Sequence, residues 1–207
     1  MGLVTKVGRL DGEGIGGTLR WFFEGLNGIQ DIGYREELQT MDALEAIFTR
    51  RSIRAYTSEP VSEEDLKVIL EAAMNAPSAN NRQPWHFIVV DDRSKLDAIM
   101  EVHPYSKMLA QAPMAIVVCG DTEVSSSYWQ QDCSAATENL LLAARALGLG
   151  TVWLGVYPRE DRVNGISRIF QLPAHVKPLA VVAVGHPAEE KGRVDRWQEE
   201  RVHRNQW

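Results

Sequence analysis

The chain has 207 residues, of which 44% are hydrophobic and 24% charged, and its formal net charge is −6 at pH 7. This length suits one domain with a full core, and the composition excludes wholesale disorder. The acidic balance argues against a nucleic-acid partner. No apolar run approaches the roughly 18 residues of a membrane span, and the N-terminus lacks a signal-peptide pattern. We therefore expect a soluble, cytoplasmic protein with no membrane partner.

Residues 1–39 are predicted to form an N-terminal extension. Gly12, Gly14 and Gly17 have the GxGxxG spacing of a dinucleotide-binding loop. That fold also needs a second strand ending in an acidic residue about 20 positions later, and the chain has no such strand. We favour a glycine-rich arm in which residues 18–26 (TLRWFFEGL) dock on the domain or on a partner. Disorder is the alternative.

Two helices are predicted before any strand. Met41–Thr49 has a short helical pattern, for which Thr40 is the predicted N-cap. Ser62 and Asp65 resemble a capping box at the start of a second helix, which Pro77 would stop. Helices that precede the strands argue against a doubly wound parallel sheet.

Runs rich in β-branched residues and bounded by Gly, Pro or Asp predict four strands. The strands are His86–Val90, Met114–Cys119, Thr151–Tyr157 and Leu179–Val184. A long buried helix over Ser127–Leu147, with Gly148 as its stop, and a surface helix over Arg159–Phe170 lie between them. We predict an α+β (mixed α/β) fold followed by a charged tail, residues 188–207.

Neither the cysteines nor the histidines have the spacing of a metal site. Cys119 lies in a strand-like run and Cys133 near the start of a helix, so both are predicted to be buried, reduced thiols. No metal site is expected from the five histidines, His86, His103, His175, His186 and His203.

Three segments suggest a site for a planar, phosphorylated cofactor. RRSIR, Arg50–Arg54, places three guanidinium groups within five residues, a pattern that suits phosphate. PSANNRQPW, Pro77–Trp85, is a loop of turn-forming and amide residues. GLGTVWLGVYP, Gly148–Pro158, includes Gly155, where backbone N–H groups can approach a ligand closely. Taken singly, each has an ordinary alternative, such as solvated arginines at a helix end or a plain polar loop.

In this order and at these separations, the three segments resemble the FMN-dependent nitroreductase-like flavoprotein family over Met41–Trp207, and the closing RVHRNQW is similar too. The resemblance implies a three-layer fold with a central, mainly antiparallel sheet flanked by helices. It further implies that residues 40–207 form an FMN-binding domain in an entwined homodimer. Non-covalent FMN would lie at the interface, and residues 188–207 would pack on the partner subunit.

The resemblance also implies which residues bind the cofactor. Arg50 and Ser52 would contact the FMN phosphate and ribityl chain, Arg54 the N1–O2 edge of the ring, and Arg196 the phosphate. Leu154 and Gly155 would offer backbone N–H groups near N5 and O4, so the family's frequent acidic residue at the Leu154 position is dispensable. The cofactor-binding set is Arg50, Arg51, Ser52, Arg54, Pro77, Ser78, Ala79, Asn81, Gln83, Lys107, Leu154, Gly155, Arg193 and Arg196. Pro77, Ser78 and Asn81 would come from the partner subunit, and Lys107 and Arg193 rest on spacing alone.

The activity implied is that of an NAD(P)H-dependent FMN oxidoreductase. Hydride would pass from NAD(P)H through flavin N5 to a nitroaromatic, a quinone or a similar small oxidant in a ping-pong cycle. No protein nucleophile is needed, and Arg54 would stabilise the negative charge of the reduced flavin electrostatically. Alternatives are a specialised enzyme of the same fold, a reductive dehalogenase or a flavin-destroying enzyme, and a non-catalytic flavin-binding regulatory protein. Residues 95–111 or 123–130 would cover the substrate.

Overall fold

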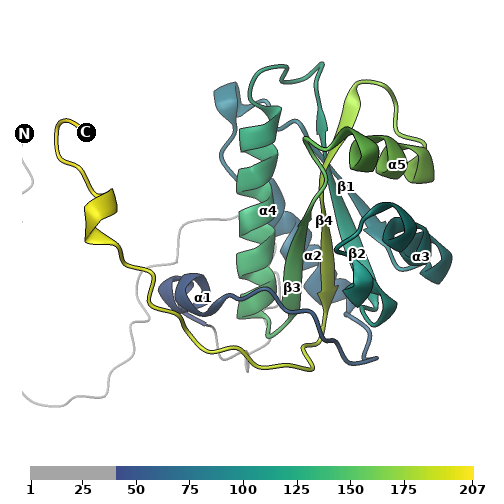
Figure 1. Cartoon of the computed structure of the whole chain (residues 1–207), viewed down its shortest axis with the longest axis horizontal. Coiled ribbons are helices and arrows are strands. Elements are labelled where there is room, and N and C mark those ends of the chain that lie inside the picture. Colours follow the sequence, from purple (N-terminus) through teal and green to yellow (C-terminus); the bar gives the residue numbers. More distant parts are fainter. Residues whose placement is uncertain (1–40) are drawn as a thin grey trace, which may run out of the picture. The chain divides into compact units, whose positions relative to one another are not determined.

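A computed structural model describes residues 41–207, in which a four-stranded sheet carries helices on both faces (Figure 1). The strands are β1 (Trp85–Val90), β2 (Met114–Asp121), β3 (Gly150–Gly155) and β4 (Val176–Gly185). Their order is β1-β2-β4-β3, and all three neighbouring pairs are antiparallel. The predicted α+β class and the central antiparallel sheet are therefore confirmed. The GxGxxG pattern and the segment 18–26 lie outside the described residues.

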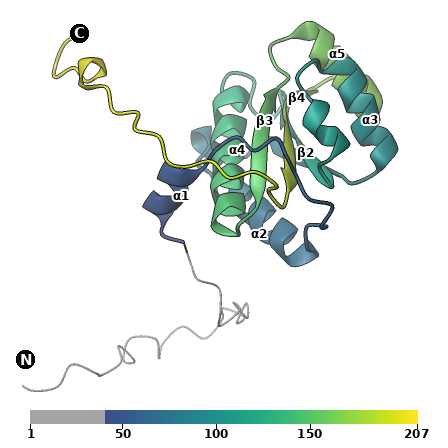
Figure 2. The same cartoon turned by 60° about the horizontal axis from the view of Figure 1, so that its bottom comes forward.

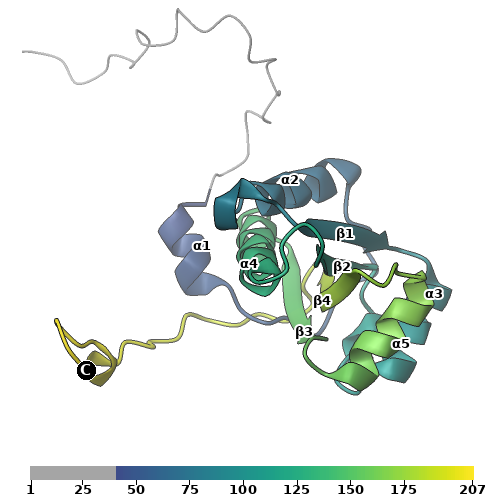
Figure 3. The same cartoon turned by 90° about the horizontal axis from the view of Figure 1, so that it is seen from above.

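The helices form two layers around the sheet, as Figure 3 shows from above. α2 and α4 cover one face, with α1 packed beside α4, and α3 and α5 cover the other. The α-helices are α1 (Ala43–Thr49), α2 (Glu63–Met74), α3 (Arg93–Val102), α4 (Trp129–Ala146) and α5 (Glu160–Phe170), and the 3-10 turns are η1 (Ala79–Asn81), η2 (Lys107–Ala110) and η3 (Glu199–Arg201). The three-layer arrangement is thus confirmed.

The central strands β2 and β4 each contain a long unbroken apolar run because both of their faces are covered. Along β2, Ile116 and Val118 pack in the core under α2 and α4, whereas Val117 and Cys119 pack in the core under α3 and α5. Successive side chains of a strand point to opposite faces, so two covered faces require an unbroken apolar run. This explains why the sequence MAIVVC shows no alternation of polar and apolar residues.

The predicted helix ends are partly right. Ser62 caps α2, and its Oγ accepts a hydrogen bond from the Asp65 N–H at 3.0 Å. Gly148 follows α4 with a φ of 78°, as a glycine stop requires. The prediction of Thr40 as the cap of α1 is wrong, because the helix begins later and Asp42 accepts from the N–H of Leu44 at 2.6 Å.

Helix α3 falls in a segment that the sequence had suggested as a substrate cover. Asp92 caps it, since its Oδ1 accepts hydrogen bonds from the N–H and the hydroxyl of Ser94 at 2.8 and 2.6 Å. These hydrogen bonds lower the pKa of the Asp92 carboxyl. Residues 95–102 of that segment therefore belong to a helix that packs on the sheet and on α5, whereas residues 103–111 are a turn and η2. That the segment covers a substrate stays a prediction.

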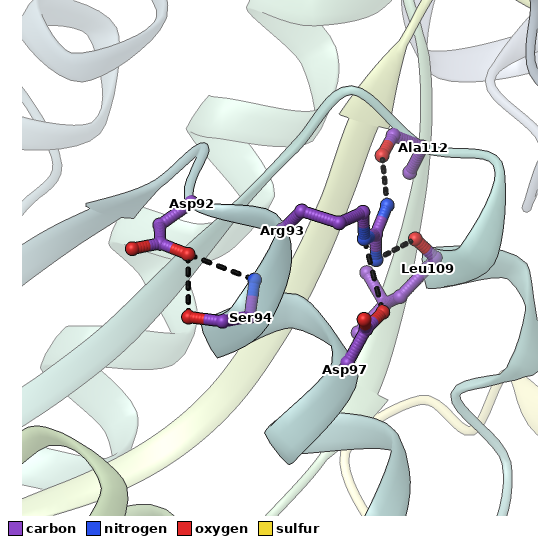
Figure 4. A network of polar contacts seen from close by, with 6 residues as sticks. All are labelled: Asp92, Arg93, Ser94, Asp97, Leu109 and Ala112. Carbon is purple, nitrogen blue, oxygen red and sulfur yellow. Dashed lines mark hydrogen bonds and ion pairs between the residues drawn. The ribbon is translucent and has the colours of Figure 1, made fainter.

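Arg93, the first residue of α3, ties the helix to the segment that follows it. Figure 4 shows its guanidinium donating to the carbonyl oxygens of Leu109, at 2.5 Å, and Ala112, at 3.5 Å. The same side chain pairs with Asp97 one turn along the helix. These contacts hold η2, and with it Lys107, at a defined place beside the sheet.

Both cysteines are buried and free, as the sequence predicted. Burial raises the pKa of the Cys119 thiol to about 12 and, as the largest cause, that of Cys133 to about 12. Neither thiol is therefore a nucleophile at neutral pH.

Gly120→Ala is expected to destabilise the fold. A Cβ at Gly120 would lie 2.4 Å from Cε3 of Trp129 and 3.0 Å from Sγ of Cys133, both buried in α4. Overpacking of this kind lowers the free energy of unfolding by about 1–3 kcal/mol. Urea unfolding measures the change against Gly192→Ala, whose Cβ would meet nothing within 4 Å. Equal midpoints for the two variants would show that the core relaxes around the added methyl group.

Candidate functional site

The arginine-rich segment after α1 lies between edge strand β3 and the chain that follows β4. Figure 2 shows these two stretches crossing the molecule together, the first dark blue and the second yellow-green. The Ile53 N–H donates to the Thr151 carbonyl at 2.9 Å, and the Ala188 N–H donates to the Ala55 carbonyl at 2.9 Å. Residues far apart in the sequence therefore fix the backbone of RRSIR.

A salt bridge beside this segment holds its backbone further. Lys191 Nζ donates to the carbonyl of Ser52 at 2.7 Å and to the carboxylate of Glu189 at 2.8 Å. Glu189 also accepts from the backbone N–H of Arg54 at 2.5 Å. The hydrogen bond from Lys191 and then that from Arg54 lower the pKa of Glu189. The contact to Glu189 uses the backbone of Arg54 and not its guanidinium group, and Arg54 also lines a cavity.

That cavity, which we call the β3 cavity, has a volume of about 530 Å³. It brings together four of the predicted cofactor residues, Arg54, Lys107, Leu154 and Gly155, and adds Arg162. The other lining residues are His103, Pro104, Tyr105, Met108 and Trp153. Its lining contains three Arg or Lys side chains and no carboxylate, so the cavity suits a ligand with an anionic or electron-rich edge.

Gly155 leaves an open place in the wall of the β3 cavity. A Cβ there would meet no atom within 4 Å among the described residues, so crowding within this part of the chain does not require glycine. Leu154, by contrast, turns a buried side chain into the core. A ligand in the cavity would meet these two residues through their backbone, as the sequence suggested for both.

Arg50 and Arg51 line two further hollows. The first, the arginine cavity, has a volume of about 470 Å³ and includes Arg145 and Lys191. The second, the tail groove, has a volume of about 500 Å³ and runs along Ile47, Phe48 and residues 193–197. Four predicted cofactor residues, Arg50, Arg51, Arg193 and Arg196, therefore gather in the tail groove, beside Asp195. Their role in binding phosphate stays a prediction.

Contacts inside these hollows show how the arginines are held. Arg51 Nη1 donates to the Gly192 carbonyl at 2.6 Å, and Arg193 lies over the Phe48 ring at 4.3 Å from its centre. The Arg50 guanidinium lies 3.4 Å from the carboxylate of Glu138 in α4. Sequence reasoning missed Arg145 and Lys191, because a single arginine at a helix end and a single lysine in a tail are ordinary surface residues.

The loop Pro77–Gln83 has an unusual backbone. Asn80, Asn81 and Gln83 have φ values of 53°, 54° and 50°, in the left-handed region that disfavours residues with a Cβ. Within the loop, Gln83 donates from its backbone N–H to Ser78 Oγ at 3.1 Å and from its side chain to Asn81 at 3.0 Å. Such strain is typical of functional loops.

The loop is anchored to α4 and lies apart from the hollows that Arg50, Arg51 and Arg54 line. The Ala79 N–H donates to the buried carboxylate of Asp132 at 2.9 Å. Pro77, Asn81 and Gln83 are exposed, and no residue of the loop lines the β3 cavity, the arginine cavity or the tail groove. Within one chain, the segment Arg50–Arg54 and the loop Pro77–Gln83 therefore do not line a common cavity. Asp132 was also missed, because an acid in the first turn of a helix is ordinary.

Other kinds of site find no support in residues 41–207. No group of three or more His, Cys, Asp or Glu side chains in this range is placed to hold a metal ion. No helix in it is both long and apolar enough to cross a membrane.

Comparison with known proteins identifies the family. The sequence model of the Nitroreductase family matches residues 47–103 and 99–186, more than half of the chain. The chain belongs to the nitroreductase family. The resemblance inferred from its three segments is confirmed.

Individual members of the nitroreductase family agree with this assignment. A "Putative NADH dehydrogenase/NAD(P)H nitroreductase" of Methanothermobacter thermautotrophicus is 52% identical over 173 residues, 83% of this chain and 91% of its own. An FMN-dependent nitroreductase of Clostridium difficile is 32% identical with a TM-score of 0.75, over 79% of this chain and 99% of its own. A Desulfovibrio desulfuricans protein solved with FMN is 35% identical with a TM-score of 0.69, over 80% and 97%.

Proposed function

We propose that this protein is an NAD(P)H-dependent FMN oxidoreductase that reduces small oxidants such as nitroaromatics and quinones. The observation that carries the proposal is the β3 cavity, which Arg54 and Lys107 line together with the open backbone at Gly155. Family membership supports it, because relatives are named for NAD(P)H-dependent reduction and for FMN. FMN suits these hollows by charge, since Arg and Lys side chains outnumber carboxylates in each of them. Glu189 and Glu190 line the arginine cavity, Asp195 lines the tail groove, and no carboxylate lines the β3 cavity.

The residues divide the work of binding FMN. Arg50, Arg51, Ser52, Arg193 and Arg196 would hold the phosphate and the ribityl chain, since fork-shaped donors match phosphate oxygens. Arg54 and Lys107 would face the electron-rich edge of the ring, and the backbone at Leu154 and Gly155 would donate to its other edge. Arginines that are already in place stabilise developing negative charge without reorganisation. Bound FMN would supply the two-electron chemistry that links NAD(P)H to the oxidant, in a ping-pong cycle.

The second subunit of a homodimer would complete the site. Pro77, Ser78, Ala79, Asn81 and Gln83 would come from the partner. This suits the exposure of Pro77, Asn81 and Gln83 and the absence of the whole loop from the arginine-lined hollows. Exposed apolar side chains on α1 and the tail support a covered surface there. These are Leu44, Ile47, Phe48, Trp197 and Trp207, with exposed fractions from 47% to 99%. Residues 40–207 would form the FMN domain, and residues 1–39 an extension.

The absorption spectrum of the purified protein, followed by a turnover assay, tests the proposal. We expect a flavin spectrum, release of FMN on denaturation, and oxidation of NADH or NADPH with menadione or nitrofurazone as acceptor. A colourless protein that takes up no added FMN would refute the cofactor assignment. A yellow protein without turnover on any acceptor would instead indicate a flavin-binding protein that is not an enzyme.

A further inference from the structure

The carbonyl oxygen of Gly155 accepts two side-chain hydrogen bonds. His103 Nε2 lies 3.0 Å from it, and Arg162 Nη1 donates to it at 2.7 Å. The N–H of the same peptide group, that of Val156, donates to the Leu179 carbonyl at 3.0 Å. Both polar ends of the peptide that follows Gly155 are therefore held, and both acceptor positions of its carbonyl are used.

His103 is itself fixed as a donor. It is buried, with 2% of its surface exposed, and its Nδ1 accepts a hydrogen bond from the Tyr105 N–H at 3.3 Å. A neutral imidazole that accepts at Nδ1 carries its proton on Nε2, so the Nε2–H points at Gly155. Burial, as the largest cause, lowers the pKa of His103, which keeps the ring neutral. The Ser106 hydroxyl donates to the His103 carbonyl at 2.7 Å and holds the turn.

Arg162 reaches the same carbonyl from a different helix. It lies in the first turns of α5, and its guanidinium carbon is 5.4 Å from the centre of the Tyr105 ring. Gly165 lets α5 pack closely on α3, because it has no side chain there. A Cβ at this position would lie only 2.9 Å from Cβ of Val102. The two donors therefore converge on Gly155 from the end of α3, where His103 is the C-cap, and from α5, which packs on α3.

A glycine lets a ligand approach the backbone closely, but it does not restrict the backbone conformation. Without a Cβ its backbone adopts many conformations, so its orientation must be set by contacts from outside. A Cβ at Gly155 would meet nothing within 4 Å, so side-chain packing does not hold this residue. The pairing with β4 holds the Val156 N–H, and the hydrogen bonds from His103 and Arg162 hold the Gly155 carbonyl. We propose that His103 and Arg162 are positioning residues that lock the backbone of Gly155 in the orientation in which it meets the flavin. The proposal rests on the function proposed above.

The test combines a readout of the backbone with a readout of the cofactor. The variants are His103→Leu, Arg162→Met and the double variant, with Arg168→Met, at an exposed position on α5, as the matched control. We expect the Val156 N–H of the flavin-free protein to exchange with deuterium about tenfold faster in each single variant, the factor that corresponds to about one net hydrogen bond. FMN affinity should fall by about three- to tenfold in each and further in the double variant, with a shifted flavin absorption band. His103→Gln retains a side-chain N–H donor, so its Val156 exchange rate and its FMN affinity should both be close to those of the wild type.

The outcomes separate this role from the function on which it rests. A wild-type protein that binds no FMN would refute the proposed function and this role together. A double variant with faster exchange but wild-type FMN affinity and spectrum would refute only the positioning role, as would unchanged exchange. If His103→Leu does not fold, Arg162→Met decides, because the Arg162 side chain is only half-buried.

Discussion

Arg54→Ala is expected to retain the fold while weakening FMN binding and making the flavin harder to reduce, by on the order of 1–3 kcal/mol. The backbone N–H of Arg54, which the substitution keeps, makes the contact to Glu189. The guanidinium lines the β3 cavity beside Leu154 and Gly155. Reduction of FMN adds negative charge to the ring, and a fixed cation favours that charged form.

Dye equilibration gives the midpoint potential, and quenching of flavin fluorescence gives the dissociation constant. Arg54→Lys should have a smaller effect, since it keeps the charge and loses only the fork of donors. Arg168→Ala is the control, because it removes an exposed arginine of α5 that lines none of the three hollows. A midpoint potential equal to that of the wild type would refute the electrostatic role of Arg54.

Much of the fold could be predicted because local signals and tertiary packing agree. Ser62 and Gly148 mark helix ends by their own chemistry, and the strands are β-branched runs that two covered faces require. Thr40 and Asp42 are both good caps, and only the start of the helix decides between them. Helix α3 was expected only as an unplaced helix between two strands, although Asp92, Leu96 and Ile99 have the spacing of a cap and an apolar face.

The site could be predicted where residues belong to a motif or, for Lys107, follow the spacing of the family. Arg54, Lys107, Leu154 and Gly155 were predicted to share a cofactor, and the structure places them in one cavity. Their role in binding FMN stays a prediction. His103 gave no signal, because its partner is a backbone carbonyl 52 residues away in the sequence. A contact of this kind depends on the packing of helices on a sheet and leaves no local pattern.

The contacts with helix α4 support the proposal that two subunits build each site. Arg50 meets α4 at Glu138, and the loop Pro77–Gln83 meets it at Asp132. Six residues along a helix correspond to about 9 Å along the axis and to faces about 120° apart. The arginines and the loop of one chain therefore lie on different sides of α4, whereas a two-fold dimer can bring the loop of one subunit to the arginines of the other.

Mixing two inactive variants tests this arrangement. Arg50→Ala removes a predicted phosphate ligand, and Asn81→Gly removes a loop side chain at a φ of 54°, which glycine adopts without strain. Half of the randomly mixed dimers would be heterodimers with one intact site, so NADH oxidation should recover to about a quarter of the wild-type rate. Arg50→Ala mixed with Arg54→Ala is the matched control, since both residues belong to the same segment and every site would keep one defect. No recovery in the first mixture would show that each subunit builds its site alone. Recovery in the control would show instead that Arg50 and Arg54 do not belong to the same site.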